Sequence, residues 1–295
     1  MKNKKIPSPK IKLTYNFLKF YIIGIYNKAD EDHMWIMASA IAFNFVICSI
    51  PFTLILFSIL GMYLDSAQRV SDIQLYLDKV LVLPEPLKST ITHQVLGRIN
   101  ELSSHTTITS IIGISALIWT ASGLFSTIRD ALNKIYKINI EVFYLIGKFK
   151  DIVMVLVVFL FFILSVASTS LFSIITSSGI DFINQYVNIG FANAIITILL
   201  GLLFSFLMFL IIYRIVPHGQ VNKKVALISA LSSAIMFELL KHLFTMYLVS
   251  FSNFSAVYGA YAALVSIVFW IYYSSFIFVL GAEIGQLYNE KRLLK

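Results

Sequence analysis

The sequence predicts an all-α fold: a polytopic bundle of six transmembrane helices in a single domain spanning residues 1–295. The first reason is composition, because 58% of the residues are hydrophobic and 13% are charged, whereas soluble domains average about 45–50% and about 25%. The second is that the apolar residues form six long blocks, and the third is that the basic residues cluster on one side of them. This pattern excludes a water-soluble globular protein. It also excludes a disordered one, which needs low hydrophobicity and high charge.

Each apolar block is long enough for a helix to cross the hydrocarbon core of a bilayer, which takes about 20 residues. A membrane barrel would instead need many short segments of alternating hydrophobicity. The six predicted spans cover residues 36–63, 108–128, 152–176, 191–216, 225–249 and 257–284.

The segment before the first span, residues 1–33, is more than a polar tail. Between residues 11 and 26, apolar and aromatic side chains alternate with Lys12, Asn16 and Lys19. This pattern predicts an amphipathic helix. Either it lies in the cytoplasmic interface with its lysines toward anionic headgroups, or it packs on the other spans as the start of the bundle.

The connection between the first two spans, residues 64–107, is the longest polar piece of the chain. A structureless loop of this length is uncommon in a compact protein. Two amphipathic runs flank a Leu-Pro-Glu-Pro break at residues 83–86. We therefore expect two short helices that cap the outer mouth of the bundle.

The distribution of lysine and arginine predicts the orientation. Of the 23 basic residues, 18 lie before the first span, after the last, or in the connections 2–3 and 4–5, and four lie in the outer loop. The positive-inside rule then places both termini in the cytoplasm. Because the net charge of +8 follows this topology, it does not indicate a nucleic-acid partner, and no basic-aromatic platform accompanies it.

Residues for catalysis or metal binding are not grouped in the sequence. Cys48 is the single cysteine, and the five histidines are scattered over both sides and the membrane, whereas metal sites need clustered ligands. The motifs His-Glu-x-x-His and Gly-x-Ser-x-Gly are absent from the printed sequence. We therefore expect no catalytic residue, no metal and no cofactor.

The candidate site is a group of polar side chains within the membrane, where such groups are costly and therefore informative. Glu238, Lys241 and His242 share one face of the fifth span, so Glu238 is expected to pair with one of the other two. At 1.5 Å per residue, Glu238 lies roughly 20 Å from the cytoplasmic end. The other candidates lie on the first and sixth spans: Asn44, Ser49, Pro51, Ser266 and Trp270.

Two interpretations of this group remain open. A polar belt around a buried acid suits a path for a substrate or a proton. Alternatively, the charges form a structural clasp that fixes the order of the helices.

Two further polar residues are expected to tie helix ends together near the cytoplasm. Glu283, in the last turn of the sixth span, is expected to pair with Arg129, Arg214 or Lys148. Asn133 is expected to cap or tie the end of the second helix.

The last third of the chain resembles the YihY/BrkB family of bacterial inner-membrane proteins. A glutamate-lysine run and a Gly-Ala-Glu ending follow each other in the same order as in the family. The sixth span is expected to carry Tyr258 and Gly259 in register with Gly281 and Glu283. Ala38 to Pro51 and Leu124 to Ile135, with its Asn133, resemble the family as well. The motif positions are Asn133, Arg214, Pro217, Tyr258, Gly259, Gly281 and Glu283.

The resemblance implies six spans and an inner (plasma) membrane location, and it leaves three functions to weigh. The first is a non-enzymatic, transport-like or lipid-handling protein that uses the site on the fifth span, with membrane lipids as partners. The second is a structural or assembly factor of the cell envelope that binds envelope proteins or a second copy of itself. The third is a membrane-bound enzyme, including the tRNA-processing ribonuclease BN label given to some members. The residues argue against this third function.

Overall fold

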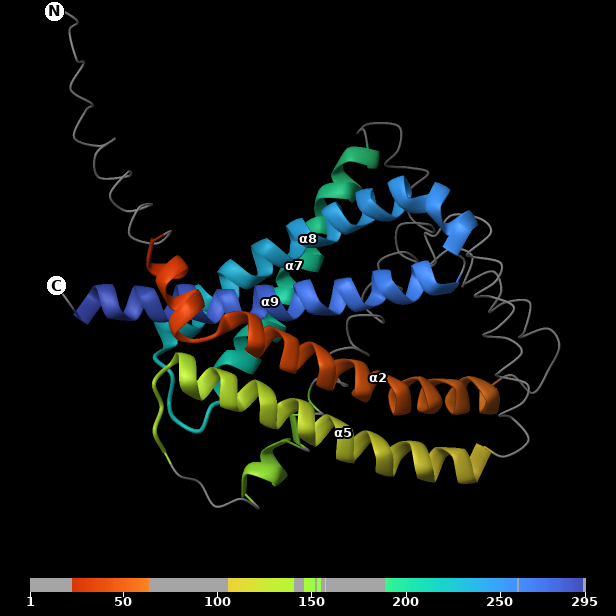
Figure 1. Ribbon diagram of the computed structural model, residues 1–295, viewed down its shortest axis with the longest axis horizontal. Helices are drawn as coiled ribbons and strands as arrows, with labels where there is room; N and C mark the ends of the chain where they lie inside the picture. The colour runs from red at the N-terminus through yellow and green to blue at the C-terminus, as the bar shows by residue number, and fades with distance from the viewer. Residues whose placement is uncertain are drawn as a thin grey trace, which may run out of the picture.

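The computed structural model (Figure 1) describes residues 23–63, 106–140, 146–151, 153–154, 157, 189–258 and 260–293. All regular structure in these ranges is helical, which confirms the all-α fold. The long helices are α2 (Met34–Tyr63), α5 (Thr106–Ile135), α7 (Ile189–Ile215), α8 (Lys223–Tyr258) and α9 (Ala260–Leu293). Residues 23–31 and 146–151 are also helical.

Among the described residues, four helices are long and apolar enough to cross a membrane. The qualifying stretches are Met34–Leu56, Ile111–Ile135, Lys223–Tyr247 and Leu264–Leu293, which correspond to the predicted first, second, fifth and sixth spans. α7 occupies the fourth span, and its described apolar stretch, Leu199–Ile215, is shorter.

The count of six spans stays a prediction, because the third span, residues 152–176, lies outside the described residues apart from positions 153, 154 and 157. The outer loop up to residue 105 and residues 1–22 of the amphipathic segment also lie outside them.

One predicted boundary is wrong. Tyr258 is the last residue of α8, and the next helix, α9, begins at Ala260, so the Tyr-Gly motif does not share a span with Gly281 and Glu283. The reason is visible in the sequence: residues 250–258 contain no charge, glycine or proline, so nothing there ends α8 early. Gly259 itself lies outside the described residues.

The helices pack in the order α7, α8, α9, α2, α5, with a further contact between α5 and α9. In Figure 1, α9 runs between α8 and α2, and α2 runs beside α5. Large apolar side chains such as Ile36, Trp119 and Leu239 face outward. Such an apolar exterior suits helices surrounded by acyl chains rather than by water.

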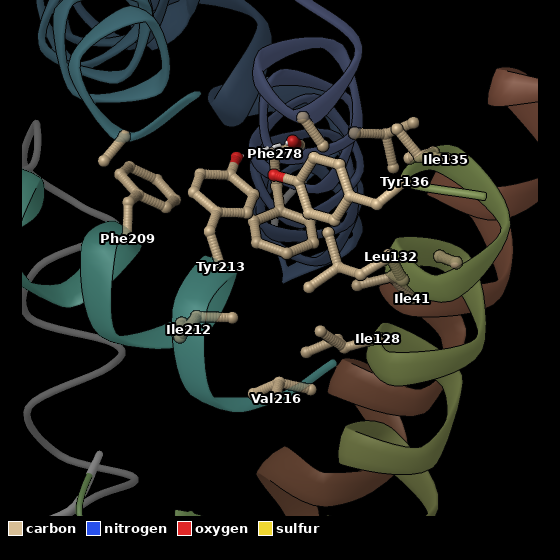
Figure 2. Close-up of a cluster of buried hydrophobic side chains, with 14 of the residues drawn as sticks. Ile41, Ile128, Leu132, Ile135, Tyr136, Phe209, Ile212, Tyr213, Val216 and Phe278 are labelled. Atoms are coloured by element: carbon tan, nitrogen blue, oxygen red, sulfur yellow. Dashed lines mark hydrogen bonds between the residues drawn. The ribbon is translucent and has the colours of Figure 1, made fainter. Parts of the chain in front are cut away.

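The buried core lies at one end of the bundle, where α5, α7 and α9 end and α2 and α8 begin. Figure 2 shows Leu132 of α5, and Tyr136 just after the end of α5, facing Ile212 and Tyr213 of α7, with Phe278 of α9 between them. We call this end the basic end, because basic residues gather there, among them Lys28, Lys134, Arg214, Lys223 and Arg292.

Small residues bring α8 and α9 into close contact at the basic end. Ala226, Ala230 and Ala234 of α8 are fully buried, and a Cβ atom added at Gly281 or Gly285 of α9 would overlap the Oγ of Ser233 or Ser229. Such residues allow the close backbone approach on which helix association in lipid depends.

Candidate functional site

The predicted intramembrane ion pair is present on α8. Lys241 Nζ lies 2.5 Å from Glu238 Oε2, and His242 Nε2 lies 3.9 Å from Glu238 Oε1. The spacings i,i+3 and i,i+4 place the three side chains on one helix face. The side chain of Glu238 is 13% exposed, that of Lys241 35% and that of His242 61%. The acid is therefore covered, while the two nitrogen-bearing side chains reach the outer surface of the bundle.

α7 supplies the other wall of this α8 site. The neighbouring residue on α7 is Gly201, where an added Cβ would lie 3.2 Å from Lys241 Nζ and 3.6 Å from Glu238 Oε2. The charged groups thus lie against the α7 backbone, at a position that has no side chain. Phe237 also lies beside the ammonium group, which is 5.8 Å from its ring centre.

Trp270 of α9 approaches the α8 site from the opposite side of α8. Its ring centre is 5.6 Å from that of Phe237 and 4.8 Å from that of Phe244. Ser266 is buried in the same helix, one turn before Trp270. Phe237 therefore connects Trp270 with the ion pair.

The candidates on the first span lie on α2, which packs between α9 and α5. Asn44 Nδ2 donates to Ala40 O at 2.9 Å and to Thr127 Oγ1 of α5 at 3.1 Å. Ser49 donates to Val46 O of its own helix at 2.7 Å, and Pro51 is buried. Asn44 thus has the partner that its depth requires, and this partner joins α2 to α5.

Glu283 is fully buried at the basic end, but its predicted partners are wrong. Its ion pair is with Lys28, whose Nζ lies 3.5 Å from Oε2. This lysine lies in the segment before α2. Residue spacing alone does not predict that this segment folds back on α9. Of the predicted partners, Arg129 pairs with the buried Asp151, Lys148 donates to Ser122, and Arg214 is exposed.

Asn133 ties the end of α5 to the connection between α7 and α8, as expected. Its Oδ1 accepts a hydrogen bond from the backbone N–H of His218 at 3.0 Å. The neighbouring Pro217 is fully buried. Burial is also the main reason that the pKa of His218 is lowered, and the positive charges of Arg129 and Lys150 add to the effect.

Sequence reasoning missed two buried tyrosine hydroxyls at the basic end. Tyr213 Oη lies 2.6 Å from Ser233 Oγ and donates to Phe278 O at 2.7 Å, and Tyr136 Oη lies 3.0 Å from Ser229 Oγ. Both tyrosines are visible in Figure 2. The available signal was the four-residue spacing of Ser229 and Ser233 beside an equally spaced alanine row, which places two hydroxyls on the packed face of α8.

The arrangement offers charged and hydrogen-bonding groups. Within the described ranges, no group of three or more His, Cys, Asp or Glu side chains is arranged to hold a metal ion. The α8 site can bind a polar or anionic group through Lys241 and His242, with Glu238 as the alternative partner of the lysine.

Comparison with known proteins gives a consistent family assignment. The family described as "Virulence factor BrkB" matches residues 25–294. A UPF0761 membrane protein of Psychromonas ingrahamii is 26% identical over 97% of this chain and 92% of its own length. Another from Pseudoalteromonas atlantica is 25% identical, over 96% and 91%, and one from Idiomarina loihiensis is 30% identical, over 70% and 71%. No solved structure matches the chain.

Proposed function

The chain belongs to the BrkB virulence-factor family, whose relatives are bacterial membrane proteins, and on this premise we propose that it is a non-enzymatic, transport-like protein that handles lipids of the cell envelope. The observation that carries the proposal is the exposure of Lys241 and His242, at 35% and 61%, on an apolar spanning helix. An ammonium group and an imidazole at this position can bind the polar headgroup of a lipid.

The depth of the α8 site supports this use. Glu238 lies 15 residues after Lys223, which starts the helix, or about 22 Å along it. In a hydrocarbon core about 30 Å thick this is beyond the middle. Charged groups at such depth are costly unless they are paired or meet water or a polar ligand. Pairing with Glu238 partly offsets the cost of placing the Lys241 charge in the membrane. The exposed N–H groups of Lys241 and His242 still face the apolar exterior.

A lipid with an anionic headgroup matches the chemistry of the site. Its phosphate would accept hydrogen bonds from Lys241 and, when the imidazole is protonated or carries hydrogen on the outer nitrogen, from His242. Its acyl chains would lie along the apolar outer face of α8, where Leu239 and Leu243 are exposed. The missing side chain at Gly201 lets the charged groups lie against the α7 backbone, so a headgroup would reach Lys241 and His242 from the outer surface, where both side chains are exposed.

Several features follow from this proposal without being part of the site. The proposal includes an inner-membrane location with both termini in the cytoplasm, an orientation that the distribution of basic residues supports. Its partners are membrane lipids rather than nucleic acid, and it needs no cofactor and no catalytic residue. Envelope proteins or a second copy are partners under the alternative function as an assembly factor. One observation favours that alternative: Glu238 pairs with Lys241 within α8, so the lysine has a partner without any ligand.

Retained lipid distinguishes the two functions. We would purify the wild type, Lys241→Gln, Glu238→Gln and the control Lys224→Gln, which removes an exposed lysine at the start of α8, and quantify bound phospholipid by mass spectrometry. Lipid handling predicts that Lys241→Gln loses anionic lipid while Lys224→Gln and the wild type retain it, and that Glu238→Gln alters retention at normal expression and thermal stability. If Glu238→Gln lowers stability and none of the variants changes the lipid, the clasp is supported instead.

A further inference from the structure

The residues immediately before α2 cross the basic end of the bundle and dock on α9. We call residues 23–33 the strap. Its helix ends at a turn in which His33 has a φ of 55°, an uncommon left-handed conformation for a residue with a side chain. Gly24 packs against Leu287 of α9, where an added Cβ would lie 2.9 Å from a leucine methyl group. Lys134 at the end of α5 donates to Asp32 O at 3.1 Å.

Lys28 holds the strap to α9 through two carboxylates. Its side chain is 8% exposed, and its Nζ lies 3.5 Å from Glu283 Oε2 and 3.2 Å from Glu290 Oε1. Glu290 also binds the exposed Lys137, at 2.9 Å. Asp32 brings a further negative charge close to Glu283. A buried ammonium group thus lies among several acids.

Little apolar packing fixes the strap, although the small residue Ala29 packs against the buried core. Ile23 and Tyr26, two of its large apolar side chains, are 46% and 78% exposed, so the docked segment buries little apolar area. A helix of this length is not stable by itself in water. Glu283 is fully buried, yet neither of its oxygens accepts a well-formed hydrogen bond from the described residues. The acid therefore has an ammonium beside it but no fixed donor, and that ammonium belongs to a separable segment.

We propose that the strap is a displaceable latch, with Lys28 as the tethered ammonium ligand of the site formed by Glu283 and Glu290. When Lys28 leaves, the strap swings away about the turn at residues 32–33, and the two carboxylates become accessible from the basic end. The bundle of α2, α5, α8 and α9 stays folded, because its buried core cluster contains no strap residue, Ala29 only packing against it, and the α8–α9 seam is formed without the strap. This latch is independent of the proposed lipid site on α8.

The test is hydrogen exchange, measured by mass spectrometry on the full chain in lipid nanodiscs. Lys28→Ala is expected to speed exchange over residues 23–31 by roughly tenfold or more, while peptides from α5 and α9 keep their wild-type protection. Lys28→Arg, which keeps the charge, serves as the matched control and is expected to retain most of the protection. Added methylammonium, which replaces the missing ammonium group, is expected to slow exchange in Lys28→Ala.

Three results would overturn the latch. Unchanged exchange over residues 23–31 in Lys28→Ala would show that this lysine does not hold the strap. Loss of protection in α5 and α9 as well would show that the strap is an integral part of the fold. If methylammonium does not restore protection over residues 23–31 in Lys28→Ala, the carboxylates are not an ammonium site. None of these measurements involves lipid binding by Lys241, so the two proposals fail separately.

Discussion

Replacing Gly281 by alanine tests the close contact between α8 and α9. A Cβ at this position would overlap Ser233 Oγ and would lie 3.1 Å from both Ser229 O and Ser233 Cβ. The overlapped hydroxyl lies 2.6 Å from Tyr213 Oη, within hydrogen-bonding distance. Ser233 therefore cannot rotate away without breaking a buried hydrogen bond, and the backbone carbonyl of Ser229 cannot move at all without moving α8.

The magnitude follows from three contributions. Alanine is favoured over glycine within a helix by about 1 kcal/mol. Against this, overpacking costs about 1–3 kcal/mol, and disturbing the buried Tyr213–Ser233 bond costs about 1–3 kcal/mol, nearer the lower end because Tyr213 still donates to Phe278 O. With the overpacking cost near the middle of its range and the hydrogen-bond cost near its lower end, we expect a net loss of about 2 kcal/mol, which corresponds to a Tm lower by about 4–8 °C.

The assay is thermal unfolding of purified protein in one detergent, with Gly123→Ala as the matched control. Gly123 lies in the α5 span, and an added Cβ there would meet Asn44 Oδ1 at an ordinary distance of 3.5 Å. This variant should equal or slightly exceed the wild type. In the Gly281→Ala background, Ser233→Ala removes the overlapped oxygen and should recover part of the loss. A Tm for Gly281→Ala at or above the wild-type value would refute the reasoning.

Three other predictions concern the basic end. Arg129→Ala leaves the buried Asp151 without its guanidinium partner and should lower the free energy of unfolding by about 3–5 kcal/mol, measured by thermal unfolding. Adding Asp151→Asn should recover part of this stability, and no recovery would contradict the pairing. Asn133→Ala removes the acceptor of the His218 N–H and should cost about 1–2 kcal/mol, whereas Asn133→Asp should keep the Tm near wild type. Burial lowers the pKa of His218 from its usual 6.5, so the unfolded chain binds the proton more tightly than the folded one. The Tm should therefore be steady above about pH 7 and fall as the pH drops below 6.5. His218→Gln should show a weaker fall, and a pH profile identical to that of the wild type would exclude this residue as a cause.

The sequence was sufficient for much of the fold because membrane insertion imposes a strong constraint. A helix must be apolar along its length to cross the bilayer, so the spans are visible as blocks. The Glu238–Lys241 pair was also predictable, since i,i+3 neighbours on a helix meet whatever the tertiary structure. That Asn133 ties the end of α5 was predictable, because an amide near a helix end needs a partner, but its partner in the α7–α8 connection, the His218 N–H, was not.

Contacts between distant segments could not be read in this way. Glu283 needs a cation, but several lysines and arginines lie near the basic end, and residue spacing does not show which segment folds back on α9. Packing of Gly24 on Leu287 brings Lys28 there. The boundary after Tyr258 was misplaced because the sequence continues from α8 into α9 without a charge or a proline.

The most direct test of lipid handling is an experimental structure of the protein in nanodiscs that contain anionic phospholipid. Our account predicts density for a headgroup beside Gly201, within hydrogen-bonding distance of Lys241 or His242, with acyl chains along α8. Density for acyl chains alone at this position, with Lys241 still closed on Glu238, would contradict the account and leave the ion pair as a structural clasp.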